Sequence, residues 1–356
     1  MDNEMSKIPE TTIGIDLGDK YTHFCVLDNA GLIIEEGRIV TTKEAFRCKF
    51  TGIEPARIAI ETGTHSRWVQ QMLAEARHKV IVANPRKLRM IYQNNSKNDR
   101  LDAEQLARVA RMDPRLLSPI KHRGKKVHSD LSLMRSRDIL VAMRTRLVNH
   151  VRGVLKSNGI RPKKCSTRSF EKHILELIPD DLKPALLPVF EILSSLNVKI
   201  SWYDKQVERL SKDRHPETDL LRQVSGVGPL TALCYILTLE DPQRFKKSRS
   251  VGPYLGLRPK QRHSGDHDPE LRITKAGDHD LRRLLVQSAQ YILGPFGKDS
   301  DLRRKGLSMA ERGGKVAKKR AVVAVARKLA VLLHRLWITG EAYDPLRNSE
   351  AKTKTA

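Results

Sequence analysis

The N-terminal part of the chain alternates short apolar runs with polar turns. Residues 12–18, 20–28 and 32–41 are rich in Ile, Val, Thr and Phe, and their length and spacing predict three short strands. The segment Asp28–Gly31 lies between the second and third strands and contains Asn and Gly, which favour a tight turn. The pattern therefore predicts that the second and third strands form a hairpin.

Helical and extended patterns alternate after this hairpin. The expected elements are a helix near 43–50, a buried strand at Arg57–Glu61, a helix within His65–Arg77, a strand at Val80–Ala83 and a helix at Asp102–Met112. Hairpin-connected strands followed by alternating helices and strands are typical of an RNase H-like (RuvC-like) α/β fold. We predict this fold for a first domain, residues 1–125.

Residues 126–215 have a helical pattern and form the second predicted domain, a coiled-coil linker. A long basic helix is expected at 129–157 with Ser129 as its N-cap. Apolar residues between Leu193 and Leu210 recur at steps of three and four, as in a coiled-coil seam. Such a seam fits either a helical hairpin within one chain or a contact between subunits, and the spacing does not choose between them.

A third, mainly α-helical domain is predicted at 216–345, followed by a disordered tail at 346–356. It opens with a segment that resembles a helix-hairpin-helix motif, in which Gly226 and Gly228 permit tight turns and expose amide groups able to grip a phosphate. A final apolar helix is expected at Arg320–Trp337.

The net charge of the chain indicates which class of partner it binds. The 356 residues include 66 Lys and Arg against 41 Asp and Glu, a formal net charge of +25, which favours nucleic acid as a partner. No apolar run approaches the ~20 residues of a membrane-spanning helix, and residues 1–10 lack a signal-peptide core. The four cysteines lie far apart without zinc-binding spacing. These features predict a reduced, cytoplasmic, nucleoid-associated protein without a membrane contact.

Four carboxylates are candidates for one catalytic site: Asp16, Glu61, Asp99 and Asp102. The first two end predicted strands, and the last two are three residues apart at the entrance of a helix, so they can face the same side. Carboxylates brought together repel one another, and two Mg²⁺ ions would relieve that repulsion and polarise a phosphodiester. The alternative for each acid is a surface position or a helix cap, and for Asp99 the capping role competes directly with metal binding.

The segment Gly14–Gly18 also resembles the first phosphate motif of actin-like sugar kinases. Those enzymes need a second Gly- and Thr-rich phosphate loop and an adenosine motif, and the chain contains neither. The kinase interpretation is therefore remote.

Ordered motifs point to one family. They are the Lys-Asn-Asp-x-x-Asp-Ala run at 97–103, the Gly-Val-Gly-Pro turn at 226–229, the Tyr-Leu-Gly-Leu-x-Pro segment at 254–259 and the basic–apolar helix at 318–330. Together with the four acids, they resemble the transposases of the insertion-sequence one-ten and eleven-eleven family, also called DEDD transposases. The likeness spans almost the whole chain.

The resemblance implies that Asp16, Glu61, Asp99 and Asp102 bind Mg²⁺ and that Ser264 is the nucleophile. Many relatives continue after this serine as Gly-Gly-Lys, whereas this chain reads Gly-Asp-His, so a lysine role is not carried over. The resemblance also implies a non-coding bridge RNA that pairs with donor and target DNA, and a homodimer that assembles to a tetramer.

Three cations near the serine are candidate phosphate clamps: Arg262, Lys275 and Arg282. The alternative for each is a solvated charge. Ser264 itself needs activation, because a serine hydroxyl is a poor nucleophile at neutral pH.

The leading hypothesis is a DNA transposase that exchanges strands through a covalent serine–DNA intermediate, with Mg²⁺ and a bridge RNA. The alternative is a RuvC-like, Mg²⁺-dependent Holliday-junction nuclease that uses the acids alone and forms no covalent intermediate. A third hypothesis is a non-enzymatic nucleic-acid binder whose acids are structural.

Overall fold

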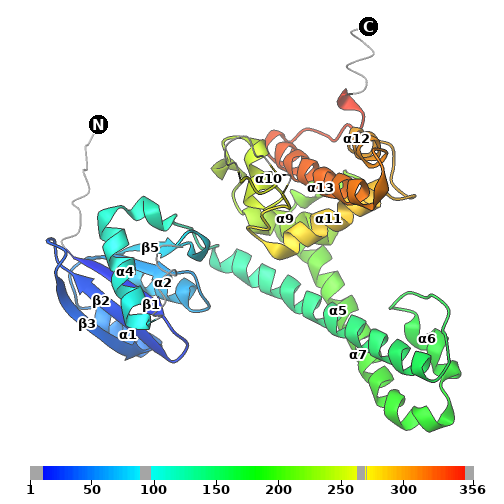
Figure 1. The fold of residues 1–356 in the computed structure, drawn as a ribbon, viewed down its shortest axis with the longest axis horizontal. Helices are drawn as coiled ribbons and strands as arrows, with labels where there is room; N and C mark the ends of the chain where they lie inside the picture. The colour runs from blue at the N-terminus through cyan, green and yellow to red at the C-terminus, as the bar shows by residue number, and fades with distance from the viewer. Residues whose placement is uncertain (1–10, 89–97, 263–268, 270, 349–356) are drawn as a thin grey trace, which may run out of the picture. The chain divides into compact units, whose positions relative to one another are not determined.

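A computed structural model of the chain describes residues 11–88, 98–262, 269 and 271–348. The chain divides into two compact units, Met1–His122 (unit 1) and Arg123–Ala356 (unit 2) (Figure 1). The division into three folded domains stays a prediction, because the structure separates only the first from the rest.

Unit 1 is built on a mixed five-stranded sheet of order β3-β2-β1-β4-β5. The strands are β1 (Thr12–Leu17), β2 (Tyr21–Leu27), β3 (Ile33–Val40), β4 (Arg57–Glu61) and β5 (Lys79–Ala83). The first three pair antiparallel, whereas β4 is parallel to β1 and β5 is parallel to β4. Each strand lies within two residues of its predicted range. The sheet is consistent with the predicted RNase H-like fold.

The turn between β2 and β3 forms as expected. Gly31 has φ +85°, and its amide donates to the Asp28 carbonyl at 3.1 Å. The Asp28 carboxylate also accepts from the Leu32 amide at 2.8 Å. The Asp-Asn-Ala-Gly sequence thus closes the hairpin with local contacts alone.

Helices cover both faces of the sheet (Figure 1). The helices α1 (Lys43–Phe50) and α2 (Ser66–Glu75) pack on one face, where Ile13, Ile15 and Phe46 are fully buried. The helix α4 (Asp99–Met112) covers the other face through Ala103 and Ala107. Short 3₁₀ turns complete the unit at η1 (Pro85–Lys87) and η2 (Pro114–Leu117).

Unit 2 begins with a helical hairpin. The long helices α5 (Lys125–Ser157) and α7 (Lys183–Arg214) run antiparallel, with Arg137 bonded to Asp204 at 2.6 Å and Arg144 to Asn197 at 2.9 Å. The connection contains α6 (Phe170–Ile174), η3 (Leu175–Leu177) and η4 (Asp180–Leu182).

The predicted N-cap of the first long helix was wrong. α5 begins four residues before Ser129, and its N-cap is Gly124. The Gly124 amide donates to the Glu240 carboxylate at 2.8 Å. A contact between residues far apart in sequence therefore sets the start of the helix.

The predicted seam packs within the chain. Leu193, Leu196, Ile200 and Val207 on α7 are buried in the part of unit 2 that the structure describes. The helical hairpin is thus present, whereas a contact of this seam between subunits stays a prediction.

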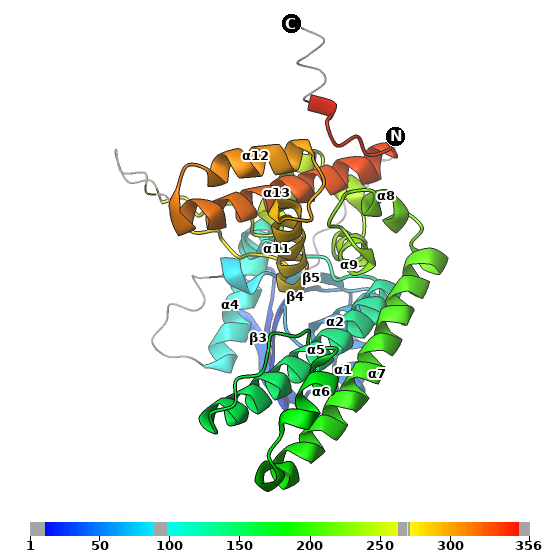
Figure 2. The ribbon, with the colours of Figure 1, turned by 90° about the vertical axis from the view of Figure 1, so that its right-hand side faces the viewer.

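The remainder of unit 2 packs around one buried helix. Its elements are α8 (Thr218–Arg222), α9 (Pro229–Leu239), η5 (Pro242–Arg244), η6 (Ser248–Ser250), α10 (Val251–Tyr254), α11 (His279–Leu293), α12 (Asp301–Ala310) and α13 (Gly314–Thr339). The helix α9 is buried from Thr231 to Leu239, and the Tyr235 hydroxyl donates to the Ala330 carbonyl of α13 at 2.6 Å. Figure 2 shows α12 lying along α13.

The final helix is longer than expected, because α13 extends six residues before Arg320 and two beyond Trp337. Among the described helices, none is long and apolar enough to span a membrane.

Candidate functional site

Two of the predicted acids lie at one edge of the sheet. Parallel pairing sets Gly14 beside Ala59 and Ile15 beside Ile60. Continued by one residue, this register sets Asp16 beside Glu61, at the carboxyl ends of β1 and β4. Both side chains are half-buried.

The helix α4 brings the other two acids to this edge. A Cβ atom added at Gly14 would lie 2.0 Å from the Ala103 carbonyl oxygen and 2.4 Å from the Ala107 nitrogen. Further down the sheet, the Arg57 guanidinium donates to the Ala110 carbonyl at 3.1 Å. The helix therefore runs antiparallel to β1, and its N-terminus lies toward the end of β1 that carries Asp16.

Asp99 and Asp102 occupy the first turn of α4, so the helix begins three residues earlier than predicted. The cap is Asn98, whose side chain accepts from the Arg100 amide at 3.1 Å. The capping interpretation of Asp99 was therefore wrong. Asp102 is half-buried and Asp99 is exposed. Carboxylates are favoured at this end by the helix dipole, which offsets part of their mutual repulsion.

His23 belongs to this cluster and was missed from the sequence. It lies directly opposite Asp16 in the antiparallel pair of β1 and β2, and its Nδ1 is 3.9 Å from the Asp99 carboxylate. The signal was the tight β1–β2 connection, because the register across such a turn fixes which side chains are neighbours.

Sulfur takes no part in the chemistry of this cluster. Cys25 lies opposite Gly14 beneath α4 and is fully buried. Burial, reinforced by the carboxylates of Glu36 and Glu104, raises the pKa of its thiol to about 11. The thiol is therefore protonated at neutral pH, and the donors of the cluster are carboxylate oxygens and one imidazole.

The donor chemistry fits a hard divalent cation. Within the described part of the chain, no three His, Cys, Asp or Glu side chains already form a complete metal site. Mg²⁺ does not need one, because it is held by one or two carboxylates together with water and substrate phosphate. Four acids at one sheet edge can supply such ligands.

Replacing Gly14 by Ala should destabilise unit 1 and misplace the acids together. The added Cβ meets the α4 backbone, which cannot turn aside as a flexible side chain would. We expect a loss of about 3 kcal/mol in the free energy of unfolding, measured by urea titration with circular dichroism. Gly52→Ala is the control, because nothing lies within 4 Å of its added Cβ. Equal stability of the two variants would contradict the close approach of α4 to β1.

The predicted nucleophile, Ser264, lies outside the described residues, but the chain on both sides of it is described. The two flanking segments form a pair of arms, residues 256–261 and 271–275. The Lys260 amide donates to the Arg272 carbonyl at 3.0 Å, and the Thr274 amide donates to the Arg258 carbonyl at 2.9 Å. The arms are thus joined as a short two-stranded stem.

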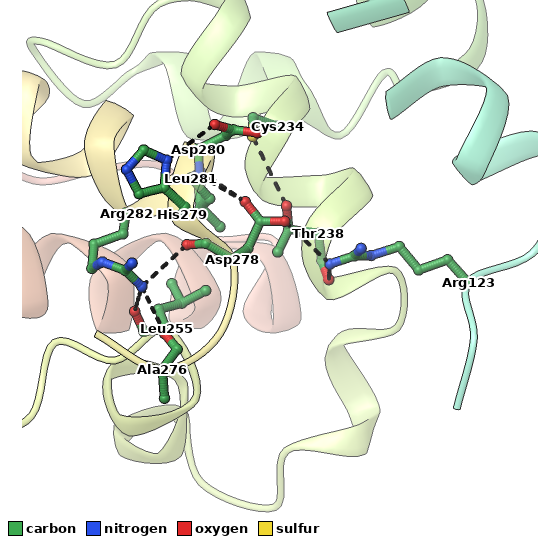
Figure 3. A network of polar contacts seen from close by, with 10 residues as sticks. All are labelled: Arg123, Cys234, Thr238, Leu255, Ala276, Asp278, His279, Asp280, Leu281 and Arg282. Atoms are coloured by element: carbon green, nitrogen blue, oxygen red, sulfur yellow. Dashed lines mark hydrogen bonds and ion pairs between the residues drawn. The ribbon is translucent and has the colours of Figure 1, made fainter. Parts of the chain in front are cut away.

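Arg282 anchors the base of these arms (Figure 3). It is 8% exposed, and its Nη1 donates to the carbonyls of Leu255 at 3.0 Å and Ala276 at 2.6 Å. The two backbone segments cross closely, since a Cβ at Gly256 would lie 2.3 Å from the Ala276 nitrogen. Arg282 therefore has a structural role, and its predicted binding of phosphate stays untested.

The other two predicted clamps are more accessible. Arg262 ends the described part of the first arm and is exposed. Lys275 is also exposed, and its φ of +55° lies in the left-handed region. Both positions allow a contact with an external phosphate.

The predicted helix-hairpin-helix turn joins α8 to α9. Gly226 has φ +89°, and a Cβ there would lie 3.1 Å from the Ser288 carbonyl of α11. Gly228 is the N-cap of α9, with nothing within 4 Å of an added Cβ. Gly226 therefore permits packing within the protein, whereas Gly228 is the more open of the two. Phosphate binding by this turn stays a prediction.

Two family models match the chain. One, of the DEDD type found in IS110 elements and described as a transposase, matches residues 13–159. The other, described as the IS116/IS110/IS902 family of transposases, matches residues 218–300. Together they cover more than half of the chain. The first match includes the four acids, and the second includes Ser264.

Curated relatives are similar in sequence to this chain over most of their length. The chain is 26% identical to the transposase for insertion sequence element IS1111A of Coxiella burnetii, over 93% of this chain and 90% of the relative. It is 28% identical to a probable family 20 transposase of Pseudomonas aeruginosa, over 83% and 88% respectively. It is 27% identical to the transposase for insertion sequence element IS1328 of Yersinia enterocolitica, over 80% and 84%.

Proposed function

Because the chain belongs to the IS110/IS116 family of transposases, which act in DNA transposition, we propose that it cuts and rejoins DNA through a covalent serine–DNA intermediate. The observation that carries this proposal is the convergence of Asp16 and Glu61 with the first turn of α4 at one edge of the sheet. Carboxylates gathered at one place repel one another, so the stability of the fold does not explain their position.

The acids are the ligands of a divalent metal in this proposal. The DEDD family implies such a metal, and the oxygen donors of Asp16, Glu61, Asp99 and Asp102 suit Mg²⁺. When bound, Mg²⁺ would neutralise charge on the phosphodiester and favour ionisation of an attacking hydroxyl. His23 is paired with Asp16, and its Nδ1 lies 3.9 Å from the Asp99 carboxylate, so an imidazole stands beside two of these acids.

Ser264 supplies the hydroxyl. Its Oγ would bond to the phosphorus while the bond from phosphorus to a sugar oxygen breaks, and the serine proton would end on the leaving oxygen. This exchange conserves one phosphodiester-type bond, so the strands can be rejoined without ATP. The stem of the arms, with Arg282 at its base, fixes both ends of the segment that carries the serine.

The bridge RNA and the assembly also belong to this proposal. The net charge of +25 suits the simultaneous binding of RNA and of donor and target DNA. A homodimer that assembles to a tetramer would draw on the outer side of α7, where Ile192, Val198 and Trp202 are at least half exposed.

A RuvC-like junction nuclease is the second candidate, favoured by the position of Asp16 and Glu61 beside the first turn of α4, since metal-binding acids alone can direct a water molecule at a phosphodiester. It would hydrolyse branched DNA with water and form no adduct with the protein. A non-enzymatic binder would do neither.

The metal requirement gives a direct test. We expect wild-type protein, incubated with its RNA, donor DNA and Mg²⁺, to yield an SDS-resistant protein–DNA adduct, and we expect EDTA to reduce it to background. The adduct is measured as a shifted band on a denaturing gel. Cleavage without any adduct would instead favour the junction nuclease, and the absence of both would favour the binder.

A further inference from the structure

The outer face of α13 carries a dense group of cations. Lys319, Arg320, Arg327 and Lys328 recur after about two helical turns, so they share one side of the helix, and all four are exposed. The opposite side is buried in the core through Val325, Leu329 and Leu333. Basic residues on an exposed helix face do not by themselves indicate a binding site. The surface that they line decides whether they form one.

That face of α13 forms one wall of a groove of about 1360 Å³. The opposite wall is made by the two arms, through Lys260, Arg272 and Lys275 among others. Counting Arg249 as well, eight Lys and Arg side chains line the groove, and no carboxylate does so among the residues that the structure describes. Cations gathered without acids repel one another, so the groove favours an anionic occupant.

Apolar side chains line the groove beside the cations. They are Val316, Val323 and Val331 of α13 and Leu257 and Ile273 of the two arms. Apolar surface bordered by cations suits a ligand with both flat apolar parts and repeated negative charges. A nucleic-acid strand has this composition, because its sugars and bases are flanked by phosphates.

We propose that this groove, between α13 and the two arms, binds the phosphate backbone of the DNA strand that is cut. This inference rests on the proposed function, since the arms lead directly into the segment that carries Ser264. Lys260 and Gln261 on one side of that segment and Leu271 on the other line the groove. DNA is favoured over RNA because the strand held beside the nucleophile is the one whose phosphorus is attacked.

The test compares two double variants of α13. Lys319→Gln/Lys328→Gln removes two lysines that line the groove, and Lys315→Gln/Lys318→Gln removes two exposed lysines of the same helix that do not. Binding of a fluorescein-labelled DNA duplex of mixed sequence to the full-length protein is measured in EDTA, so that no cutting occurs. Thermal unfolding of each variant checks that the fold is kept.

For the groove variant we expect DNA affinity to fall about tenfold at ~0.1 M salt, and the slope of log affinity against log salt to shrink by about two. The control variant should lose less than about twofold. Equal losses in the two variants would overturn the proposal. With an RNA duplex of the same sequence the groove variant should lose less affinity than with DNA, and a larger loss with RNA would overturn the assignment to DNA.

This measurement is separate from the test of the serine chemistry. A groove variant that loses DNA affinity supports the groove even when wild-type protein forms no adduct. Conversely, a wild-type adduct together with unchanged DNA affinity of the groove variant would remove the groove and leave the proposed function standing.

Discussion

Ser264→Ala should yield no SDS-resistant adduct with DNA, a loss of at least about 10³-fold relative to wild type. In the proposed reaction, the substitution removes the single oxygen that would form the protein–DNA bond. The adduct is quantified with labelled donor DNA, Mg²⁺ and the RNA. Binding of the RNA should be unchanged, because the hydroxyl contributes little to the charge of the protein.

The matched control is Ser308→Ala, since Ser308 lies exposed on α12. It should form the adduct at the wild-type level. An undiminished adduct in Ser264→Ala would remove this serine from the role of nucleophile. Loss of the adduct with retained cleavage would show that water replaces the serine, as in a junction nuclease.

Asp16→Asn should lower DNA cleavage by about 10³-fold while leaving DNA binding nearly intact. Asparagine has the same shape but no negative charge, so β1 keeps its packing while the cluster loses a metal ligand. Asp16 lies on the central strand of the sheet, so pairing with β2 and β4 holds its backbone on both sides. The rate is measured as single-turnover cleavage of donor DNA at saturating protein.

Asp19→Asn serves as the control for this substitution. Asp19 follows the same strand but is exposed, with its carboxylate 3.5 Å from the His65 ring. It should cleave at a rate close to wild type. Equal rates for Asp16→Asn and wild type would mean that the acids at the sheet edge do not bind the catalytic metal.

Local sequence patterns predicted unit 1 well. Apolar Ile13 and Ile15 alternate with small or polar residues, and the Asp28–Gly31 turn closes on its own contacts, so the strands and the hairpin followed from neighbours in sequence. Asn and Asp are both favoured N-cap residues, and Asn98 directly precedes Asp99. The sequence alone therefore did not show which of the two caps the helix. The start of α4 was therefore misplaced by three residues.

Distant contacts explain the other differences. Glu240 draws the start of α5 back to Gly124, so Ser129 lies inside the helix. The structural role of Arg282 could not be predicted, because charge alone does not reveal that two segments cross at Gly256 and leave carbonyls that need a donor. His23 was missed because its role depends on the register between two strands.

Arg123, the first residue of unit 2, bonds the Thr238 carbonyl at 3.4 Å and lies 3.6 Å from the Asp278 carboxylate. Asp278 in turn is the N-cap of α11, where its carboxylate accepts from the amides of Asp280 and Leu281. Arg282 lies in the same first turn of the helix (Figure 3). The first residue of unit 2 is thus bonded close to the base of the two arms. Asp278 links these two places, because its carboxylate lies beside Arg123 and its carbonyl accepts from the Arg282 guanidinium at 3.4 Å. A displacement of the chain at its entry into α5 would therefore also shift the base of the two arms.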